Sequence, residues 1–400
     1  MDTRRRILAA TLTFASVLAA SRAVRADDSA ALGLNASTSN EVLTYVSRHR
    51  DDVGLVAYEV GPDGGPLAGG LFLSHLGSEA MPLGSTFKIV TLAAYARAAA
   101  AGDLDPGEEV TVSDWEAFYL PGTDGDAHRS ALTALGIPSD DLGFALDPTV
   151  RVTLDDLAAA MIRASDNAAT DYLRERLGAP ALASTLAALD IERHGLPRSV
   201  LGTFLSWENH ADGGLDKERL EALLQQSPDA YSAEVERLAE LYTTDPSWRD
   251  AELAWRADGG PVLAPFSERT AAHHLFVQGS AGTYARLMAG ILAGTLFPEV
   301  ENAILRRHLE WPMTNPGIAE SFNAFGTKGG SLVGVLTEAT YYEPRVGPYA
   351  GHRFVCVLFL REMPLLSWLK LSASGATQLF QLQIVVDPEF AARVARVLSR

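Results

Sequence analysis

Strand-like patterns lie at both ends of this chain, and helical patterns fill the region between them. Residues 54–60 and 70–74, joined by a glycine-rich turn, predict a hairpin near the N-terminus. Residues 330–342 and 353–361 predict strands near the C-terminus. The segments with helical patterns are residues 42–49, 87–101, 154–177, 283–292 and 388–398. We therefore expect an α/β (α+β) fold, in which both chain ends build one antiparallel sheet and a helical lobe is inserted in the middle.

Lysine is rare in this chain, which has four lysines against 29 arginines. Lys88 follows Ser85 by three residues at the start of a predicted helix, where residues at this spacing are neighbours. An amine, unlike a guanidinium group, can give up its proton. Lys88 would then accept the hydroxyl proton of Ser85 and make it a nucleophile. The alternative is an ordinary serine near a solvated lysine, because this spacing often occurs by chance.

Two more polar segments follow in chain order, Ser165-Asp166-Asn167 and Lys328-Gly329-Gly330. Taken alone, the first segment fits a helix cap equally well, because serine, aspartate and asparagine are the usual cap residues. Lys328 on an inner strand would attract a substrate carboxylate and favour loss of the Ser165 proton; on a surface strand it would have neither effect. The two glycines would let the backbone approach a ligand closely.

The order of these three segments resembles that of the class A β-lactamases and of the wider family of penicillin-recognising serine hydrolases. The residues that carry the resemblance are Pro82–Ile89, Met161–Thr170 and Phe325–Gly330. The similarity is one of motifs and their order, and it extends from about residue 40 to the C-terminus. It implies a β-lactamase/transpeptidase-like fold and an acyl-serine reaction.

The resemblance also implies roles for the middle segment. Ser165 would pass a proton to the leaving nitrogen of the substrate. Asn167 would hydrogen-bond Lys88 and the amide of the substrate's side chain. Asp166 would pair within the protein.

By the same resemblance, the backbone N–H groups of Ser85 and Ser331 would form the oxyanion hole, with Gly330 beside the substrate. Position 329 is glycine where the family usually has threonine. This replacement removes one hydroxyl contact with the substrate.

Hydrolysis also needs a base that activates water to release the acyl group, and class A enzymes use a glutamate on a loop. Ser206-Trp207-Glu208-Asn209 resembles that loop, which makes Glu208 the candidate. Residues 194–205 lack the family's usual arginine-leucine-aspartate-arginine sequence, and Glu208 lies farther along the chain than the family pattern. The alternative is an exposed loop acid. Whether Glu208 acts as this base therefore decides between an efficient β-lactamase and a relative with slow turnover.

The chain divides into a signal peptide and one catalytic domain. The predicted parts are a signal at 1–26, a β-lactamase-like domain at 27–400, an α/β lobe at about 40–95 and 320–400, and a helical lobe at about 96–319. Residues 115–144 exceed the family's usual length, and residues 211–269 form an atypical acidic insertion. This insertion would cover a cleft, bind a partner or only decorate the fold.

The formal net charge of −17 argues against nucleic acids and anionic membrane surfaces as partners. A small-molecule β-lactam or a cell-wall peptide is the expected substrate, and the protein is expected to be a monomer. His273, His274, His308 and His352 fit no known metal-ligand spacing, and no phosphate-binding glycine pattern follows a strand. We therefore expect no metal and no cofactor.

The first residues predict export. Arg4–Arg6 precede the apolar run Ile7–Ala20, which is followed by small residues before a predicted mature start near Asp27. The arginines fit either a twin-arginine or a Sec signal. Cys356, the single cysteine, predicts a buried thiol and leaves no lipoprotein anchor near the cleavage point. We expect a periplasmic or secreted protein without a stable membrane anchor.

The function predicted from the sequence is that of an exported serine hydrolase that opens β-lactam rings through an acyl-Ser85 intermediate. One alternative is a D-alanyl carboxypeptidase, or another amide or ester hydrolase, with the same serine–lysine centre. Another is a penicillin-binding sensor that is acylated without turnover. The predicted lack of an anchor weighs against the sensor.

Overall fold

The computed structural model describes residues 36–191, 194–260 and 266–399, which form two compact units. Of the described residues, unit 1 comprises those up to Thr86, Ile191, His194 and those from Gln278 onward, and unit 2 comprises Phe87–Asp190 and those between Gly195 and Val277. The predicted export signal and mature start lie outside the described residues. Within the described ranges, no helix is both long and apolar enough to cross a membrane.

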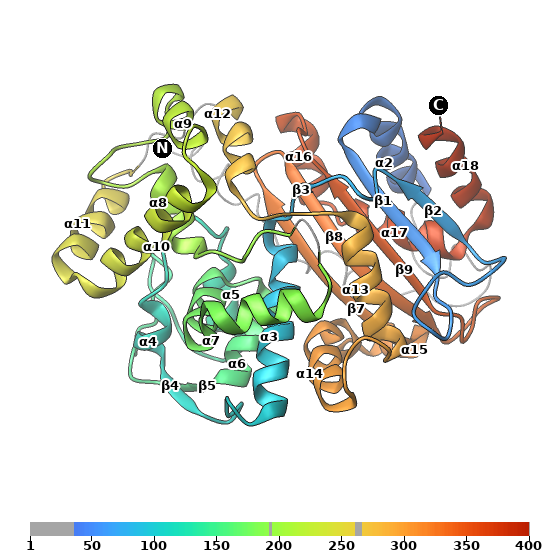
Figure 1. The fold of residues 1–400 in the computed structure, drawn as a ribbon, viewed down its shortest axis with the longest axis horizontal. Helices are drawn as coiled ribbons and strands as arrows, with labels where there is room; N and C mark the ends of the chain where they lie inside the picture. The colour runs from blue at the N-terminus through green and yellow to red at the C-terminus, as the bar shows by residue number, and fades with distance from the viewer. Residues whose placement is uncertain (1–35, 192–193, 261–265, 400) are drawn as a thin grey trace. The chain divides into compact units, whose positions relative to one another are not determined.

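Unit 1 is built on a five-stranded antiparallel sheet with the strand order β2-β1-β9-β8-β7 (Figure 1). The strands are β1 (Val53–Glu59), β2 (Phe72–His75), β7 (Phe322–Leu332), β8 (Val335–Pro344) and β9 (Phe354–Leu360). The N-terminal strand β1 pairs with the C-terminal strand β9 over seven residues, from Val53 opposite Leu360 to Glu59 opposite Phe354. This pairing confirms the predicted sheet assembled from both ends of the chain.

Helices cover both faces of this sheet. On one face lie α2 (Ala36–Arg48), α17 (Ala376–Val386) and α18 (Pro388–Leu398), and α13 (Ala281–Ala293) packs on β1, β8 and β9 from the other. All seven residues of β9 are buried as a result. A strand covered on both sides has no solvent-facing position, which explains why its sequence is continuously apolar.

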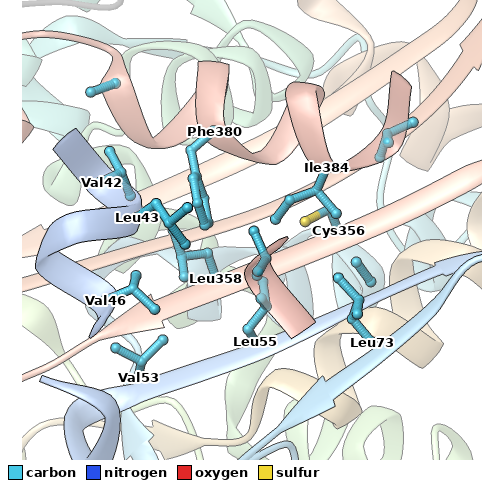
Figure 2. Packing of buried hydrophobic residues seen from close by; sticks show 14 of the residues in the cluster. Val42, Leu43, Val46, Val53, Leu55, Leu73, Cys356, Leu358, Phe380 and Ile384 are labelled. Carbon is cyan, nitrogen blue, oxygen red and sulfur yellow. The ribbon is translucent and has the colours of Figure 1, made fainter. Parts of the chain in front are cut away.

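The core beneath α2 and α17 is formed by interlocking aliphatic and aromatic side chains (Figure 2). Phe380 of α17 points toward Leu358 of β9, and Ile384 of the same helix lies beside Cys356. Cys356 is fully buried in the same cluster, and burial raises the pKa of its thiol. The predicted buried thiol is confirmed.

Short elements complete unit 1. They are η3 (Arg50–Asp52), β3 (Met81–Pro82), η4 (Gly84–Phe87), β6 (Gln278–Gly279), α14 (Glu299–Leu309), η7 (Trp311–Thr314), α15 (Pro316–Ser321) and α16 (Leu365–Ser372). β3 and β6 pair as a separate two-stranded sheet. This pairing ties the segment just before Ser85 to the segment that enters α13.

Unit 2 is mainly helical. Its helices are α3 (Lys88–Ala101), α4 (Val112–Glu116), α5 (Ala127–Ala134), α6 (Leu154–Ala159), η5 (Ala160–Ala164), α7 (Asn167–Ala188), α8 (Val200–Trp207), α9 (Lys217–Leu224), α10 (Pro228–Thr244), α11 (Pro246–Ala257), α12 (Phe266–Ala271) and η6 (Ala272–Leu275). A small sheet pairs β4 (Glu109–Thr111) with β5 (Arg151–Thr153). α3 packs along α7, α8 packs against α7 and α10, and α9 to α11 lie in the predicted 211–269 insertion.

Most predicted elements are present, but two boundaries are wrong. The helix predicted at 154–177 is interrupted at Ser165, which has a left-handed backbone with φ 66°. The strand predicted at 330–342 is two strands, β7 and β8, joined by a turn at Gly334 with φ 81°. Apolar periodicity continues through both turns, so the pattern alone does not reveal them. The sequence analysis also missed α17.

The packing of unit 1 predicts a large stability cost for Phe380→Ala. The ring is fully buried, and its removal leaves a cavity between α17 and the sheet, with a loss of about 3–5 kcal/mol in the free energy of unfolding. Chemical denaturation measures this loss. The matched control is Phe72→Ala, because Phe72 is 59% exposed and its removal should cost less than about 1 kcal/mol. Similar losses in both variants would contradict the described core.

Candidate functional site

Ser85 lies in the tight helical turn η4, which continues directly into α3. Ser85 and Lys88 are therefore separated by one turn of a continuous helical segment, and the predicted helix start is confirmed. The N–H groups at such a start have no partner within the helix, so they are available to an anionic oxygen. Gly84 opens the turn with a left-handed backbone, φ 48°, which favours glycine.

Within unit 1, strand β7 passes very close to this turn. A Cβ atom on Gly330 would lie 2.5 Å from the Leu83 carbonyl oxygen and 2.6 Å from the Ser85 nitrogen. A Cβ on Gly84 would lie 2.9 Å from the Ser331 nitrogen. Both positions are thus sterically restricted to glycine, and the predicted oxyanion-hole nitrogens of Ser85 and Ser331 belong to two backbone segments in close contact.

Threonine hydroxyls fix the turn to the sheet. Thr337 of β8 donates a hydrogen bond to the Leu83 carbonyl at 2.6 Å, and its hydroxyl lies 2.8 Å from that of Thr86. Thr86 and Thr337 are both buried. Buried hydroxyls that satisfy one another resist displacement, so Ser85 is held on a rigid support.

Lys328 lies on β7, and its side chain is buried. Its ammonium group donates to the Gly329 carbonyl at 2.6 Å. Alternation along a strand puts Lys328 and Gly330 on one face of the sheet. At the end of the motif, the Ser331 hydroxyl accepts a hydrogen bond from the indole of Trp368 in α16 at 3.2 Å. Unit 1 therefore carries Ser85, Lys328, Gly330 and Ser331 from the predicted site.

In unit 2, Lys88 is fully buried and surrounded by oxygen atoms of one turn. Its ammonium nitrogen donates to the Ser165 carbonyl at 2.6 Å, to the Asp166 carbonyl at 3.2 Å and to Oδ1 of Asn167 at 2.7 Å. The predicted hydrogen bond between Asn167 and Lys88 is present. Three acceptors match the three protons of an ammonium group.

Two opposing effects act on the pKa of Lys88. Burial disfavours the charged amine and lowers the pKa of Lys88 to about 8, although the negative charges of Asp166, Asp171 and Asp124 oppose this lowering. An amine with such a pKa exchanges its proton near neutral pH. This is the property required of a base or proton shuttle.

The turn that holds Lys88 has an unusual backbone. Residues 160–164 form a single π-helical turn, and Ser165 then adopts its left-handed conformation. Such turns in α-helices often mark functional sites. Asp166 caps the next helix, because its carboxylate accepts the Ala169 N–H at 2.7 Å. Asp166 is thus a helix cap, while its own carbonyl and its two neighbours supply oxygens to Lys88.

Asp166 also forms a buried pair with His128, a residue that the sequence analysis missed. His128 Nδ1 lies 2.7 Å from Asp166 Oδ2, and its Nε2 lies 3.4 Å from Oε1 of Glu116. All three side chains are buried. The expected pairing of Asp166 within the protein is confirmed. No local signal identifies His128, because it lies 38 residues before Asp166 in the chain.

Glu208 follows the last residue of α8 and is buried rather than exposed, with 6% of its surface accessible. Its carboxylate lies 3.9 Å from the guanidinium of Arg269, and its carbonyl accepts from Arg256 at 3.2 Å. In the part of the chain that the structure describes, the carboxylates whose charge raises the Lys88 pKa are those of Asp166, Asp171 and Asp124, and Glu208 is not among them.

The described residues contain no group of three or more His, Cys, Asp or Glu side chains arranged to hold a metal ion. His273, one of the histidines considered for such a site, is buried, and burial lowers its pKa to about 3. It is therefore neutral at physiological pH.

A family model described as "Beta-lactamase enzyme family" matches residues 38–354. The chain belongs to this β-lactamase family. The match includes all three motif segments, and the resemblance inferred from the sequence is confirmed. The chain has the serine-hydrolase fold of the family, with its sheet built from both chain ends and helices in the middle.

Several solved structures are similar to this chain. The β-lactamase of Sphaerobacter thermophilus is 17% identical, with 87% of this chain and 97% of that chain covered and a TM-score of 0.49. PBP-A is 16% identical, with 86% and 96% covered and a TM-score of 0.47. A β-lactamase of Chitinophaga pinensis is 12% identical, with 86% and 98% covered and a TM-score of 0.48. A search of curated proteins found no match.

The close approach of β7 to the Ser85 turn predicts that Gly330→Ala is destabilising. The new methyl group would meet backbone atoms of Leu83 and Ser85, which cannot move alone, so we expect a loss of about 1–3 kcal/mol in unfolding free energy. Denaturant titration measures it. Gly107→Ala is the control, because its methyl group would meet only the Asp105 carboxylate, at 3.4 Å. Equal stability of the two variants would contradict the described approach.

Proposed function

We propose that this protein is a β-lactam hydrolase that acts through an acyl-Ser85 intermediate. The observation that carries the proposal is the state of Lys88. It lies one helical turn from Ser85, it is fully buried, and its pKa is lowered to about 8. A surface lysine would have neither the burial nor the lowered pKa. The family membership of residues 38–354 gives independent support.

In the proposed acylation, Lys88 accepts the Ser85 proton while the Ser85 oxygen attacks the lactam carbonyl carbon. The developing oxyanion is stabilised by the backbone N–H groups of Ser85 and Ser331. The C–N bond then breaks, Ser165 passes its hydroxyl proton to the leaving nitrogen, and Lys88 returns to Ser165 the proton that it took from Ser85. Lys328 attracts the substrate carboxylate. The proposed scheme uses only groups of the protein and no metal or cofactor.

The second half of the reaction is hydrolysis of the acyl-enzyme, for which Glu208 is the proposed base. Its carboxylate is buried and lies 3.9 Å from the guanidinium of Arg269. It is not, however, among the carboxylates that act on Lys88. The lack of the family's usual sequence at residues 194–205 favours a second candidate function, a penicillin-binding protein or peptidase that is acylated readily and releases the product slowly.

The two candidates differ in the fate of the acyl-enzyme. Purified protein is mixed with a chromogenic β-lactam and with a fluorescent penicillin, and intact mass is recorded over time. Continuous colour without a lasting adduct supports the hydrolase. A stable adduct on Ser85 supports slow release, and no reaction with either compound would overturn both.

Substitutions at the acylating pair test the first step. Ser85→Ala removes the attacking oxygen, so no covalent adduct should form. Lys88→Arg should be nearly as damaging as Lys88→Ala, with acylation slowed by about 10²–10⁴-fold, because arginine keeps its proton. Adduct formation is followed by intact mass, and circular dichroism checks the fold. Near-normal acylation by the arginine variant would show that position 88 needs only positive charge.

Glu208→Gln tests the second step. Glutamine keeps the size of the side chain but removes the basic oxygen, so acylation should survive while release slows by about 10²–10⁴-fold. The expected signal is a burst of about one product per enzyme with an accumulated adduct. Glu236→Gln serves as the control, because Glu236 is a half-exposed partner of Arg174. If Glu208→Gln turns over normally, another group activates the water.

A further inference from the structure

Helix α5 contributes a buried histidine, His128, to the turn that holds Lys88. His128 is inaccessible to solvent, and its two ring nitrogens face the carboxylates of Asp166 and Glu116. Its ring stacks on Tyr119 at 4.1 Å between centroids and meets the edge of Trp115 at 4.6 Å. The stretch 115–144, which exceeds the family's usual length, contains His128, Trp115, Glu116 and Tyr119. The histidine is therefore fixed on every side.

The surroundings of His128 favour its charged form. Burial alone would make the ring neutral, but the charge of Asp166, the hydrogen bonds to Asp166 and Glu116, and the charge of Asp124 raise the pKa of His128 to about 9. In return, the charge and hydrogen bond of His128 help to hold the pKa of Asp166 below its usual value against the effect of burial. At neutral pH the two groups form a buried ion pair.

This pair lies one residue from two of the oxygens that hold Lys88. The Asp166 carboxylate binds His128 and the Ala169 N–H, which fixes the residue whose carbonyl accepts from Lys88. The same carboxylate, together with Asp171 and Asp124, raises the Lys88 pKa through its charge. We expect the cation beside Asp166 to offset part of that effect, because opposite charges in close contact partly cancel at the Lys88 amine. Without it, Lys88 would keep its proton to higher pH.

We propose that His128 is a positioning residue for acylation: through Asp166 it fixes the turn that holds the Lys88 amine and limits the negative charge that this amine experiences. The inference rests on the proposed function, because acylation of Ser85 is the step that it serves. His128 itself touches neither Lys88 nor the reacting atoms in this scheme.

The test measures Lys88 directly in the full chain. Lysine labelled with ¹³C at Cε gives few signals, because the chain has four lysines, and Lys88→Arg identifies the signal of Lys88. In the wild type this signal should titrate near pH 8. In His128→Gln, which keeps a hydrogen-bond donor but removes the charge, the midpoint should rise by about one pH unit. The acidic limb of the acylation rate should move equally, with roughly tenfold slower acylation at pH 7.

His273→Gln is the matched control, since it replaces a buried histidine that is uncharged. It should leave both the Lys88 titration and the acidic limb in place, even if its stability falls. An unchanged Lys88 titration in folded His128→Gln would overturn the inference. A wild-type chain that fails to react with penicillins would instead overturn the proposed function, because the lysine titration does not depend on activity.

A second variant covers the case in which His128→Gln does not fold. Glu116→Gln keeps the shape of the side chain and the hydrogen bond between His128 and Asp166, but it removes the negative charge beside Nε2 of the imidazole. The imidazole signals of His128 should then titrate below the wild-type value of about 9. A wild-type His128 midpoint near 6.5 would overturn the inference, because the ring would then be mostly uncharged at neutral pH.

Discussion

A buried amine must be surrounded by oxygen atoms, and in unit 2 a single turn supplies them to Lys88. The cost of removing an ammonium group from water is several kcal/mol, so its three hydrogen bonds have to be satisfied by the protein. The turn at 165–167 provides all three acceptors. This turn is possible because a π-helical turn and the left-handed Ser165 end one helix immediately before Asp166 caps the next. The balance between burial and acceptors leaves Lys88 able to exchange its proton near neutral pH.

The carboxylate of Asp171, further along α7, connects this helix to the start of α8. Asp171 is buried and accepts hydrogen bonds from the Val200 and Leu201 N–H groups at 2.9 and 2.7 Å and from the Ser199 hydroxyl at 2.9 Å. These bonds satisfy the free N–H groups at the start of α8. The same helix ends at the residue before Glu208. One carboxylate thus acts on the Lys88 pKa and also fixes the helix that carries the candidate hydrolytic base.

The sheet of unit 1 holds the turn that carries Ser85 in a fixed position. Two glycines allow β7 and the Ser85 turn to approach within backbone contact, and the threonine hydroxyls bind them together. Helices α13 and α17 cover the two faces of the central strands, which makes the sheet a rigid support. The nitrogens proposed to stabilise an oxyanion therefore need no rearrangement when charge develops, and such preorganised donors are the effective ones.

The sequence alone determined the order of the elements, the hairpin of β1 and β2, the three motif segments and the helix start at Ser85. These features depend on local patterns, because strands, helices and turns have their own periodicities and residue preferences. The break at Ser165 was not predicted, although serine, aspartate and asparagine at 165–167 are the usual residues of a helix cap. Only the tertiary structure decided the burial of Lys88, whose partners lie 77 to 79 residues away in the chain. The pairing of His128 with Asp166 and the closeness of Glu208 to Arg269 were likewise decided by the tertiary structure. Burial and charge interactions depend on residues that only folding brings together.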